Sequence, residues 1–264
     1  MNLDLANRVV IVTGGSSGIG YAIAQAFAHE RAHVVICARG VDALQKAAAA
    51  LTAETQFPVV GIQVDTTQQE TLDRLVSAVY AKHRRLDILV NCAASPSGLV
   101  RNHIEELDDA ALLQDLNTKV VGYARGCKAV VPAMKQRRWG RIINIGGLTG
   151  RGSNTLSGMR NAALCHLTKT LSDQLGPDGI TVNTVHPGVI RTPHIEELFT
   201  TEASKQGVTP AQIEANFVAD TPIRRILSAE EIASTVVYLA SPHASSITGE
   251  SIAVDGGITR GIYL

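Results

Sequence analysis

Apolar positions in this chain come in short, nearly uninterrupted runs, separated by longer segments in which apolar and polar residues recur at helical spacing. Runs of β-branched and aliphatic residues without alternation predict strands that are buried on both faces of a sheet. Such runs occur at Val9–Val12, Val34–Ala38, Val59–Val64, Ile88–Asn91, Arg141–Ile145, Thr181–His186 and Ser251–Val254.

The longer segments between these runs have the periodicity of amphipathic helices. Ser228, with Glu231 three residues later, forms a capping-box signature at the start of the last helix. Because strands alternate with helices and both sheet faces must be covered, we predict an α/β fold, a doubly wound parallel sheet (Rossmann-like) with helices on both faces. The predicted helices lie near Tyr21–His29, Asp42–Thr55, Gln68–His83, Asp108–Gln136, Ser157–Leu175 and Ala229–Ala240.

The chain is expected to form one domain over residues 1–264, because no Pro/Gly/Ser-rich linker divides it. Residues 191–223 break the strand–helix rhythm with a long, polar and helix-prone segment. An insertion that follows the carboxyl end of a strand lies where such sheets bind ligands, so we predict a substrate lid at 191–223. The alternative is that this segment is a surface insertion without a role in substrate binding.

Composition narrows the classes of partner and compartment. Lysine plus arginine equals aspartate plus glutamate, 24 each, which gives no electrostatic argument for binding nucleic acid or a membrane. The four cysteines are scattered, without a C-x-x-C pair or zinc spacing, so reduced thiols, a cytoplasmic location and no metal site are expected. Neither a signal peptide nor a membrane-spanning run is predicted.

A glycine-rich segment follows the first predicted strand and opens the first helix. Glycines in this context allow a tight turn and let the backbone approach a pyrophosphate, while the helix N-terminus offers free N–H groups and a positive dipole end. The strand–turn–helix context makes this signal much more specific than the motif alone. The residues expected to bind the cofactor here are Gly14, Ser16, Ser17, Gly18, Ile19 and Gly20.

The T-G-x-x-x-G-I-G spacing resembles that of the short-chain dehydrogenase/reductase family, and the resemblance runs nearly from end to end. Asp65, after the third strand, is similar to the family's adenine-contacting aspartate. Asn91 and Ala93 belong to a segment similar to the family's N-N-A-G, with two departures.

Further along the chain, Asn117 resembles the family's active-site asparagine, and Gly140–Gly147 resembles the strand that leads to its active-site serine. Thr181–Thr192 resembles the P-G segment that closes over the nicotinamide, which implies cofactor contacts for Pro187, Gly188 and Thr192. Val254–Gly257 resembles the C-terminal strand.

The second strand indicates which dinucleotide binds. An acidic residue at its end would hydrogen-bond the ribose of NAD and repel a 2′-phosphate. The strand instead ends Cys37-Ala38-Arg39-Gly40, and the planar fork of Arg39 suits a phosphate. We therefore predict NADP as the cofactor, with NAD less favoured.

The catalytic residues of the family are mostly missing. No Tyr-x-x-x-Lys occurs anywhere in the chain. The trailing L-T-K-T-L sets a register in which Ser157 replaces the tyrosine, Asn161 replaces the lysine and Gly147 replaces the serine, so that of the four residues only Asn117 remains. An ungapped register puts Arg160 and Leu164 opposite the tyrosine and lysine, and it also lacks the pair. Asn117, Ser157 and Asn161 are thus the candidate catalytic residues.

Other residues can be considered for the lost proton transfer. Arg160 can supply charge but is not an ordinary acid or base. His166 has a suitable pKa but lies about two and a half helical turns from Ser157. His186, just before Pro187, is the best outside candidate, although a structural hydrogen bond is the more common role for such a histidine.

Two main functions follow from these residues. The first is an NADP-dependent oxidoreductase that interconverts a carbonyl and an alcohol on a small-molecule substrate, at a non-standard site. The alternative is a catalytically silent subunit or nucleotide-sensing protein. A non-redox lyase or isomerase has no positive support. The resemblance implies a homodimer or homotetramer formed through Asp108–Gln136 and Ser157–Leu175, or a hetero-oligomer with an active homologue.

Overall fold

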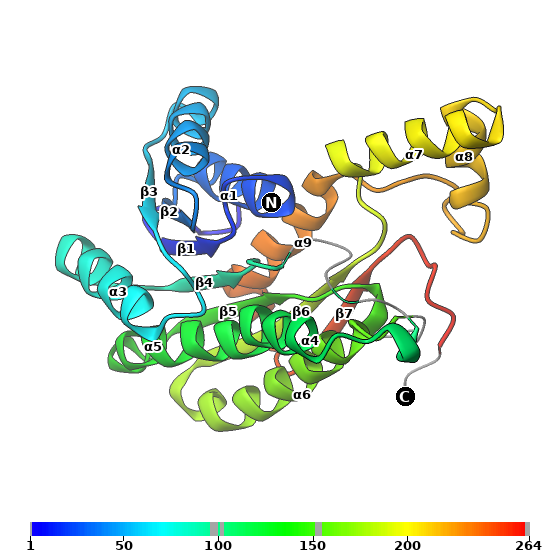
Figure 1. Cartoon of the computed structure of the whole chain (residues 1–264). Coiled ribbons are helices and arrows are strands. Elements are labelled where there is room, and N and C mark those ends of the chain that lie inside the picture. The colour runs from blue at the N-terminus through cyan, green and yellow to red at the C-terminus, as the bar shows by residue number, and fades with distance from the viewer. Residues whose placement is uncertain (1, 96–99, 101–102, 151–154, 262–264) are drawn as a thin grey trace.

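The predicted parallel sheet is present in the computed structural model, which describes residues 2–95, 100, 103–150 and 155–261. Within these residues, seven strands form one sheet in the order β3-β2-β1-β4-β5-β6-β7 (Figure 1), and all pairings are parallel. The strands are β1 Val9–Thr13, β2 His33–Ala38, β3 Val59–Gln63, β4 Ile88–Asn91, β5 Gly140–Ile145, β6 Ile180–Pro187 and β7 Ser251–Val254.

Helices cover both faces of this sheet, which confirms the predicted fold class. In Figure 1, α1, α2 and α9 lie on one face and α3, α5 and α6 on the other. The helices are α1 Gly18–His29, α2 Val41–Thr55, α3 Gln69–His83, α4 Asp109–Leu116, α5 Gly122–Arg137, α6 Gly158–Leu175, α7 Pro193–Gln206, α8 Pro210–Phe217 and α9 Ala229–Ala240.

Burial explains the uninterrupted apolar runs. Every residue of the central strands β1, β4, β5 and β6 is buried, because helices pack on both sides of them. The edge strands β3 and β7 are only partly buried. One apolar core lies beneath α1 and α9 and a second beneath α3 and α5, so the sheet is held from both sides.

The chain order reverses between β1 and β4, and this reversal fixes where a ligand can bind. From β1 the sheet runs to β2 and β3 on one side and to β4 and β5 on the other. The connections after β1 and β4 therefore leave in opposite directions and open a crevice at the carboxyl ends of these strands.

The helix predicted at Asp108–Gln136 is not uniform. Its first and last parts, α4 and α5, are α-helical, but Asn117–Val121 between them forms a π-helical turn, labelled η2. A π-turn rotates the side chains that follow it about the helix axis but leaves the apolar periodicity nearly intact. The sequence pattern therefore does not reveal it. Such turns are frequent at functional sites.

The segment at 191–223 folds into two helices with a small core of their own. Phe199 of α7 and Ile213 of α8 belong to this apolar cluster. In Figure 1 both helices project beyond the edge of the sheet, near the β7 side. Thr192 caps α7 through a 3.3 Å hydrogen bond from the Ile195 amide, and Thr209 forms a capping box with Gln212 at the start of α8.

Two further observations concern only the part of the chain that the structure describes. No helix there is long and apolar enough to cross a membrane. No group of three or more His, Cys, Asp or Glu side chains there is arranged to hold a metal ion.

A chain of buried polar side chains links α6 to three strands. Asn144 of β5 accepts a 2.9 Å hydrogen bond from Asn91 of β4 and donates a 3.0 Å bond to Thr168 of α6. The Thr168 hydroxyl lies 2.6 Å from that of Thr184 in β6. All four side chains are buried, so each depends on the others for hydrogen bonding.

We predict that Asn144→Leu lowers the free energy of unfolding by about 2 to 4 kcal/mol, because it leaves buried donors and acceptors without partners. Chemical denaturation followed by circular dichroism measures this change. Asn216→Leu, on the exposed surface of α8, is the matched control and should change stability by less than about 0.5 kcal/mol. Equal effects of the two substitutions would contradict the prediction.

Candidate active site

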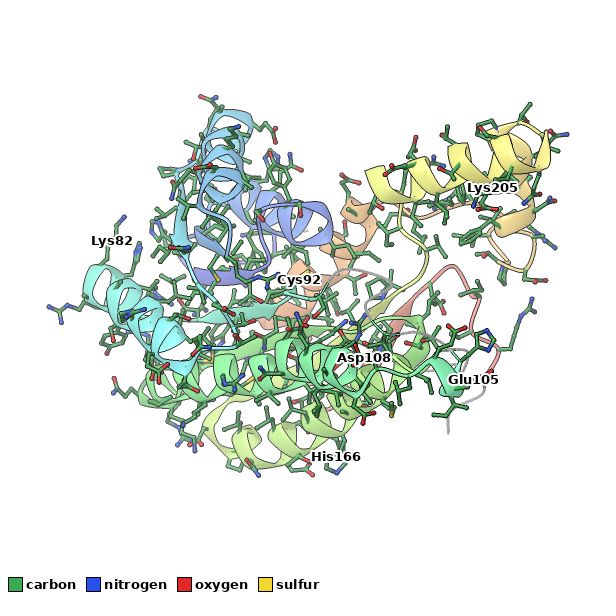
Figure 2. The ribbon with its side chains drawn as sticks, in the orientation of Figure 1. Lys82, Cys92, Glu105, Asp108, His166 and Lys205 are labelled. Carbon is green, nitrogen blue, oxygen red and sulfur yellow. The ribbon has the colours of Figure 1, made fainter. Side chains whose placement is uncertain are left out.

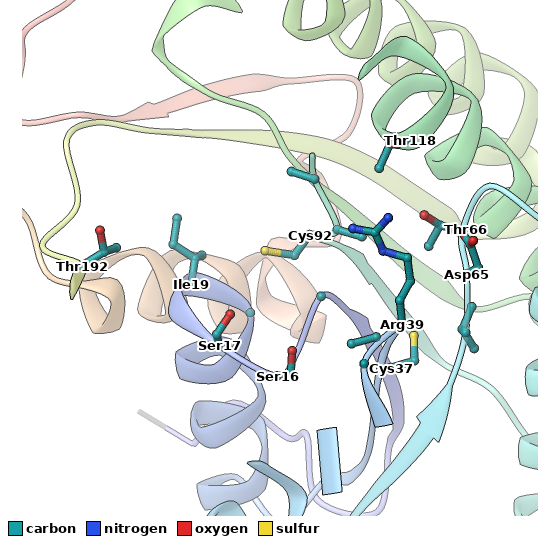
Figure 3. Close-up of a pocket in the computed structure, with 17 residues that line it drawn as sticks. Ser16, Ser17, Ile19, Cys37, Arg39, Asp65, Thr66, Cys92, Thr118 and Thr192 are labelled. Atoms are coloured by element: carbon teal, nitrogen blue, oxygen red, sulfur yellow. The ribbon is translucent and has the colours of Figure 1, made fainter. Parts of the chain in front are cut away.

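A pocket of about 840 Å³ lies in the crevice at the carboxyl ends of β1, β2 and β4 (Figure 3). Most of the residues predicted to bind the cofactor line it, namely Gly14, Ser16, Ser17, Ile19, Gly20, Arg39, Asp65, Ala93 and Thr192. The sequence reasoning did not single out the remaining lining residues, Cys37, Ala38, Gly40, Val64, Thr66, Cys92, Ala94 and Thr118, most of which are neighbours of predicted ones.

The turn between β1 and α1 is built by glycines in conformations or contacts that a side chain would disturb. Gly14 has φ +68° and Gly18 has φ +55°, in the left-handed region. At Gly20, an added Cβ would lie 2.2 Å from the Gly14 carbonyl oxygen. The start of α1 therefore packs directly against the turn, with its free N–H groups at the pocket.

Ser17 is the N-cap residue of α1, yet its side chain makes no capping hydrogen bond. A serine at this position usually satisfies one of the free N–H groups of the first helical turn. Here those donors are left for a ligand, and the dipole of α1 favours an anion. The turn thus has the chemistry of a pyrophosphate site.

Arg39 stands at the end of β2 on the rim of the pocket. Figure 3 shows its side chain extending across the opening toward Thr66 and Thr118. It makes no ion pair with any described residue, and it is exposed. An uncommitted guanidinium at this position fits the 2′-phosphate of NADP, as the sequence predicts.

Asp65 and Thr192 mark two ends of the pocket. The Asp65 carboxylate accepts hydrogen bonds from the Thr67 amide (2.9 Å) and hydroxyl (2.8 Å), which hold the loop after β3 against the pocket wall. Thr192 lies beyond Ile19 on the other side in Figure 3. The pocket therefore reaches from the end of β3 to the start of α7.

Four of the predicted cofactor residues do not line this pocket: Gly18, Asn91, Pro187 and Gly188. Asn91 is buried and its amide bonds Asn144, so its side chain supports the sheet. Pro187 ends β6, and an added Cβ at Gly188 would lie 2.6 Å from the Asp255 Cα. The P-G segment is thus packed tightly against the loop after β7.

The three candidate catalytic residues lie on two helical segments. The Asn117 amide oxygen in η2 accepts a 2.9 Å hydrogen bond from Arg125, which lies on the following helix α5. The Ser157 hydroxyl, at the start of α6, lies 3.0 Å from that of Thr155. The structure therefore shows no hydrogen bond among described residues that joins Asn117 to Ser157 or Asn161.

Asn161, on α6, lies near the end of β5, beside Gly147, the glycine that replaces the family's serine. An added Cβ at Gly147 would be 3.0 Å from Asn161 Nδ2. This nitrogen donates a 2.7 Å hydrogen bond to the Thr149 hydroxyl, whereas the buried Oδ1 has no partner among the described residues. An unpaired buried oxygen of this kind is costly unless a ligand supplies a donor.

The sequence reasoning missed Lys119, which lies two residues after Asn117. Its side chain is only 4% exposed, and its Nζ donates a 2.8 Å hydrogen bond to the carbonyl of Gly146, at the end of β5. Burial, with a smaller effect of the nearby Arg160, lowers the pKa of Lys119 to about 7. The only feature of the sequence that points to this burial is that Lys119 is a single charged residue next to the apolar pair Val120-Val121.

The two histidines considered above differ in position. His186 is 1% exposed, and its ring lies under the Gly147 backbone, with Nδ1 2.8 Å from the Gly147 oxygen and Nε2 3.3 Å from the Cys165 sulfur. Both ring nitrogens are thus occupied. His166 lies on the outer side of α6, away from the sheet (Figure 2).

Comparison with known proteins agrees with this geometry. A family model described as enoyl-(acyl carrier protein) reductase matches residues 14–259. The chain is 33% identical to the NADPH-dependent reductase BacG of Bacillus subtilis, over 98% of this chain and 100% of that protein. It is 37% identical to dehydrogenase/reductase SDR family member 4 of Oryctolagus cuniculus, over 96% of this chain and 94% of that protein.

Solved structures include one with nearly the same fold. L-sorbose reductase from Gluconobacter frateurii, complexed with NADPH and L-sorbose, superposes with a TM-score of 0.92 at 31% identity, and the match covers 99% of this chain and 100% of that one. The chain belongs to the short-chain dehydrogenase/reductase family.

We predict that Arg39→Ala weakens NADPH binding about 10- to 100-fold, because a charge-assisted hydrogen bond to a phosphate contributes about 1.5 to 3 kcal/mol. Binding of NADH, which lacks the 2′-phosphate, should change less than about threefold. Nicotinamide fluorescence titrations of both nucleotides measure the two effects. Equal losses for NADPH and NADH would show that Arg39 does not read the phosphate.

Proposed function

We propose that this protein is an NADP(H)-dependent oxidoreductase that interconverts a carbonyl and an alcohol on a small-molecule substrate. The observation that carries the proposal is the pocket at the β1–β4 crevice, where the uncapped start of α1 and the unpaired Arg39 form two separate anion sites. The NADPH-dependent relatives, and the relative that holds NADPH and a ketose, support the same cofactor and substrate class.

The chain's own residues have distinct parts in this function. The N–H groups of the β1–α1 turn bind the pyrophosphate, and Arg39 binds the 2′-phosphate. The loop after β3, with Asp65, and the segment after β4, with Ala93, form the walls along the adenosine and the second ribose. When bound, the cofactor supplies or accepts a hydride at its nicotinamide ring.

The reaction centre belongs beside the carboxyl end of β5. There the Asn161 side chain lies close to Gly147, which replaces the family's serine, and its free amide oxygen can accept a hydrogen bond from a ribose or substrate hydroxyl. Ser157 adds a hydroxyl at the start of α6. Neither side chain acts as a tyrosine–lysine pair does, because an aliphatic hydroxyl without an adjacent cation is a far weaker acid.

The helices α7 and α8 are proposed as the substrate lid. Thr192 lines the pocket and also caps α7, so the lid begins at the cofactor site. Arg191 pairs with Glu196 (2.8 Å) and with Glu214, which ties the base of α7 to α8. The pair of helices has its own apolar cluster and can move as a unit on the segments that join it to the sheet.

The first experiment combines nucleotide titration with turnover. We expect the protein to bind NADPH and to oxidise it, at 340 nm, with L-sorbose or with another compound in a panel of ketoses, diketones and 3-keto esters. Gly20→Ala should abolish both, since its Cβ would clash with the Gly14 carbonyl. Gly176→Ala, where an added Cβ meets nothing within 4 Å, is the control and should keep both.

The alternative function predicts a different result. A silent subunit or nucleotide sensor would bind NADPH in the same Gly20-dependent way but would turn over no compound of the panel. The missing tyrosine and lysine favour this alternative. Turnover that disappears in Gly20→Ala and survives in Gly176→Ala would rule it out.

We further propose assembly as a homodimer or homotetramer through α5 and α6. A groove of about 360 Å³ runs between these helices, lined by apolar side chains that include Val131, Leu167 and Leu171. Each of the three is half-buried in the single chain, as expected for side chains that a second copy covers.

Leu167→Arg should convert the oligomer to monomers, because it places a charge in a self-complementary apolar contact. Light scattering coupled to size exclusion measures the mass. Val41→Arg, on the exposed side of α2, is the control and should leave the mass unchanged. A monomeric unaltered protein, or an oligomer that contains a second, complete homologue after co-expression, would contradict a homo-oligomer.

A further inference from the structure

The π-helical turn η2 determines which side chain faces the reaction centre. Asn117 at its start is bound to Arg125 of α5, and Lys119, two residues later, points to the end of β5. With an exposed fraction of 4%, Lys119 is the deeper of the two, since Asn117 is only half-buried. The helical segment that was expected to contribute an amide thus contributes an ammonium group.

This ammonium group lies beside the end of β5, where the proposed reaction centre is located. Lys119 Nζ contacts the Gly146 carbonyl, and the next residue, Gly147, is the one that borders Asn161. The Cys92 thiol, in the pocket wall, is close enough to Lys119 for the two groups to influence each other's pKa. Lys119 therefore bonds the carbonyl that precedes Gly147 and interacts electrostatically with Cys92 in the pocket wall.

Lys119 has no carboxylate of its own among the described residues. Asp115 of α4 is the nearest acid that affects it, but Asp115 Oδ1 is paired with Arg160 of α6. A buried ammonium group with one carbonyl partner has two further N–H donors to offer. Asn161, beside the adjacent Gly147, has a buried amide oxygen without a partner among the described residues.

We propose that Lys119 is the acid and base of this reaction centre, in the place of the absent tyrosine: its ammonium group protonates the oxygen of the substrate carbonyl during reduction. The inference rests on the proposed function. It changes the roles of two candidate catalytic residues. Asn117 becomes a structural residue that is hydrogen-bonded to Arg125 of α5. Asn161 becomes a hydrogen-bonding partner of ligand hydroxyls.

In reduction, the carbonyl carbon receives a hydride, with two electrons, from NADPH, and Lys119 gives one proton to the oxygen, so that a C–H and an O–H bond replace the C=O π bond. The neutral amine then takes a proton from water. In oxidation, the neutral amine of Lys119 removes the hydroxyl proton while NADP⁺ accepts the hydride.

The charged and titratable groups around Lys119 define the pH dependence. Burial, with a smaller effect of Arg160, lowers the pKa of Lys119 to about 7, while Cys92 and Asp115 oppose this shift. Reduction needs the ammonium form, so its rate should fall as the pH rises through about 7, and oxidation should show the opposite slope. The groups that surround the site are Arg160, Cys92, Asp115, Tyr123 and His186.

Two variants of Lys119 separate proton transfer from charge. Lys119→Met removes the ammonium group at similar length, and Lys119→Arg keeps the positive charge but does not give up a proton near neutral pH. We expect both to lower kcat at least about 100-fold, the lower end of what loss of a general acid costs, while the Kd for NADPH changes less than about threefold. Lys82→Met, exposed on α3, is the control and should keep full activity.

A second readout does not depend on turnover. Protein labelled with ¹³C at lysine Cε gives one NMR signal for each lysine, and the signal missing from Lys119→Met belongs to Lys119. We expect this signal to titrate near pH 7, far below the ordinary lysine range of about 10.4. A signal that remains that of an ammonium group above pH 9 would overturn the acid–base role.

The outcomes are distinguishable. Turnover in the unaltered protein that persists within about threefold in Lys119→Met would overturn the inference and leave the proposed function standing. Turnover that Lys119→Arg retains would show that Lys119 supplies charge alone, which also overturns it. No turnover with any compound of the panel, despite NADPH binding, would overturn the proposed function and the role of Lys119 with it.

Discussion

The cofactor site depends on one close contact, the approach of the Gly20 backbone to the carbonyl of Gly14. Because no side chain separates them, α1 begins directly on the turn that leaves β1, and its first N–H groups face the crevice where the strand order reverses. The Ser17 side chain does not cap these groups. The free N–H groups that make the pocket an anion site are a consequence of this arrangement. Arg39 adds a second cationic group, which favours NADP over NAD.

The fold was predictable because burial on both faces leaves a clear trace in the sequence. Strands such as β1 and β2 have nearly unbroken apolar runs since helices cover both of their sides, and their observed bounds lie within a residue of the predicted ones. The glycine turn and Arg39 were predictable for a similar reason, as each is fixed by its place after a strand. Most of the residues that line this pocket could therefore be inferred from the sequence.

The reaction half could not, because it depends on the direction of side chains along one helix. An α-helical interpretation of the segment before α5 gives no reason to prefer Lys119 to Asn117, and the π-turn that contains both residues is invisible in the periodicity. Asn91 shows the same limit, since this residue of a recognisable motif is buried at the end of β4 and its side chain bonds Asn144. The sequence pattern predicts where the strands end. The hydrogen-bond partners of side chains depend on the three-dimensional structure.

Lys119 and Asn161 both lie against the end of β5, where Lys119 bonds the Gly146 carbonyl and Asn161 borders Gly147. In a buried setting, two ammonium groups about 4 Å apart repel by about 4 kcal/mol at an effective dielectric constant of 20. Arg160 and Asp115 already form a pair in this region, and Asp115 has no second charge to share. A lysine on α6 beside Lys119 would therefore be strongly disfavoured, whereas the neutral amide of Asn161 can donate to Thr149 and still present an acceptor. The Arg160–Asp115 pair and the neutral amide of Asn161 thus leave Lys119 as a buried cation that forms no ion pair with a described carboxylate.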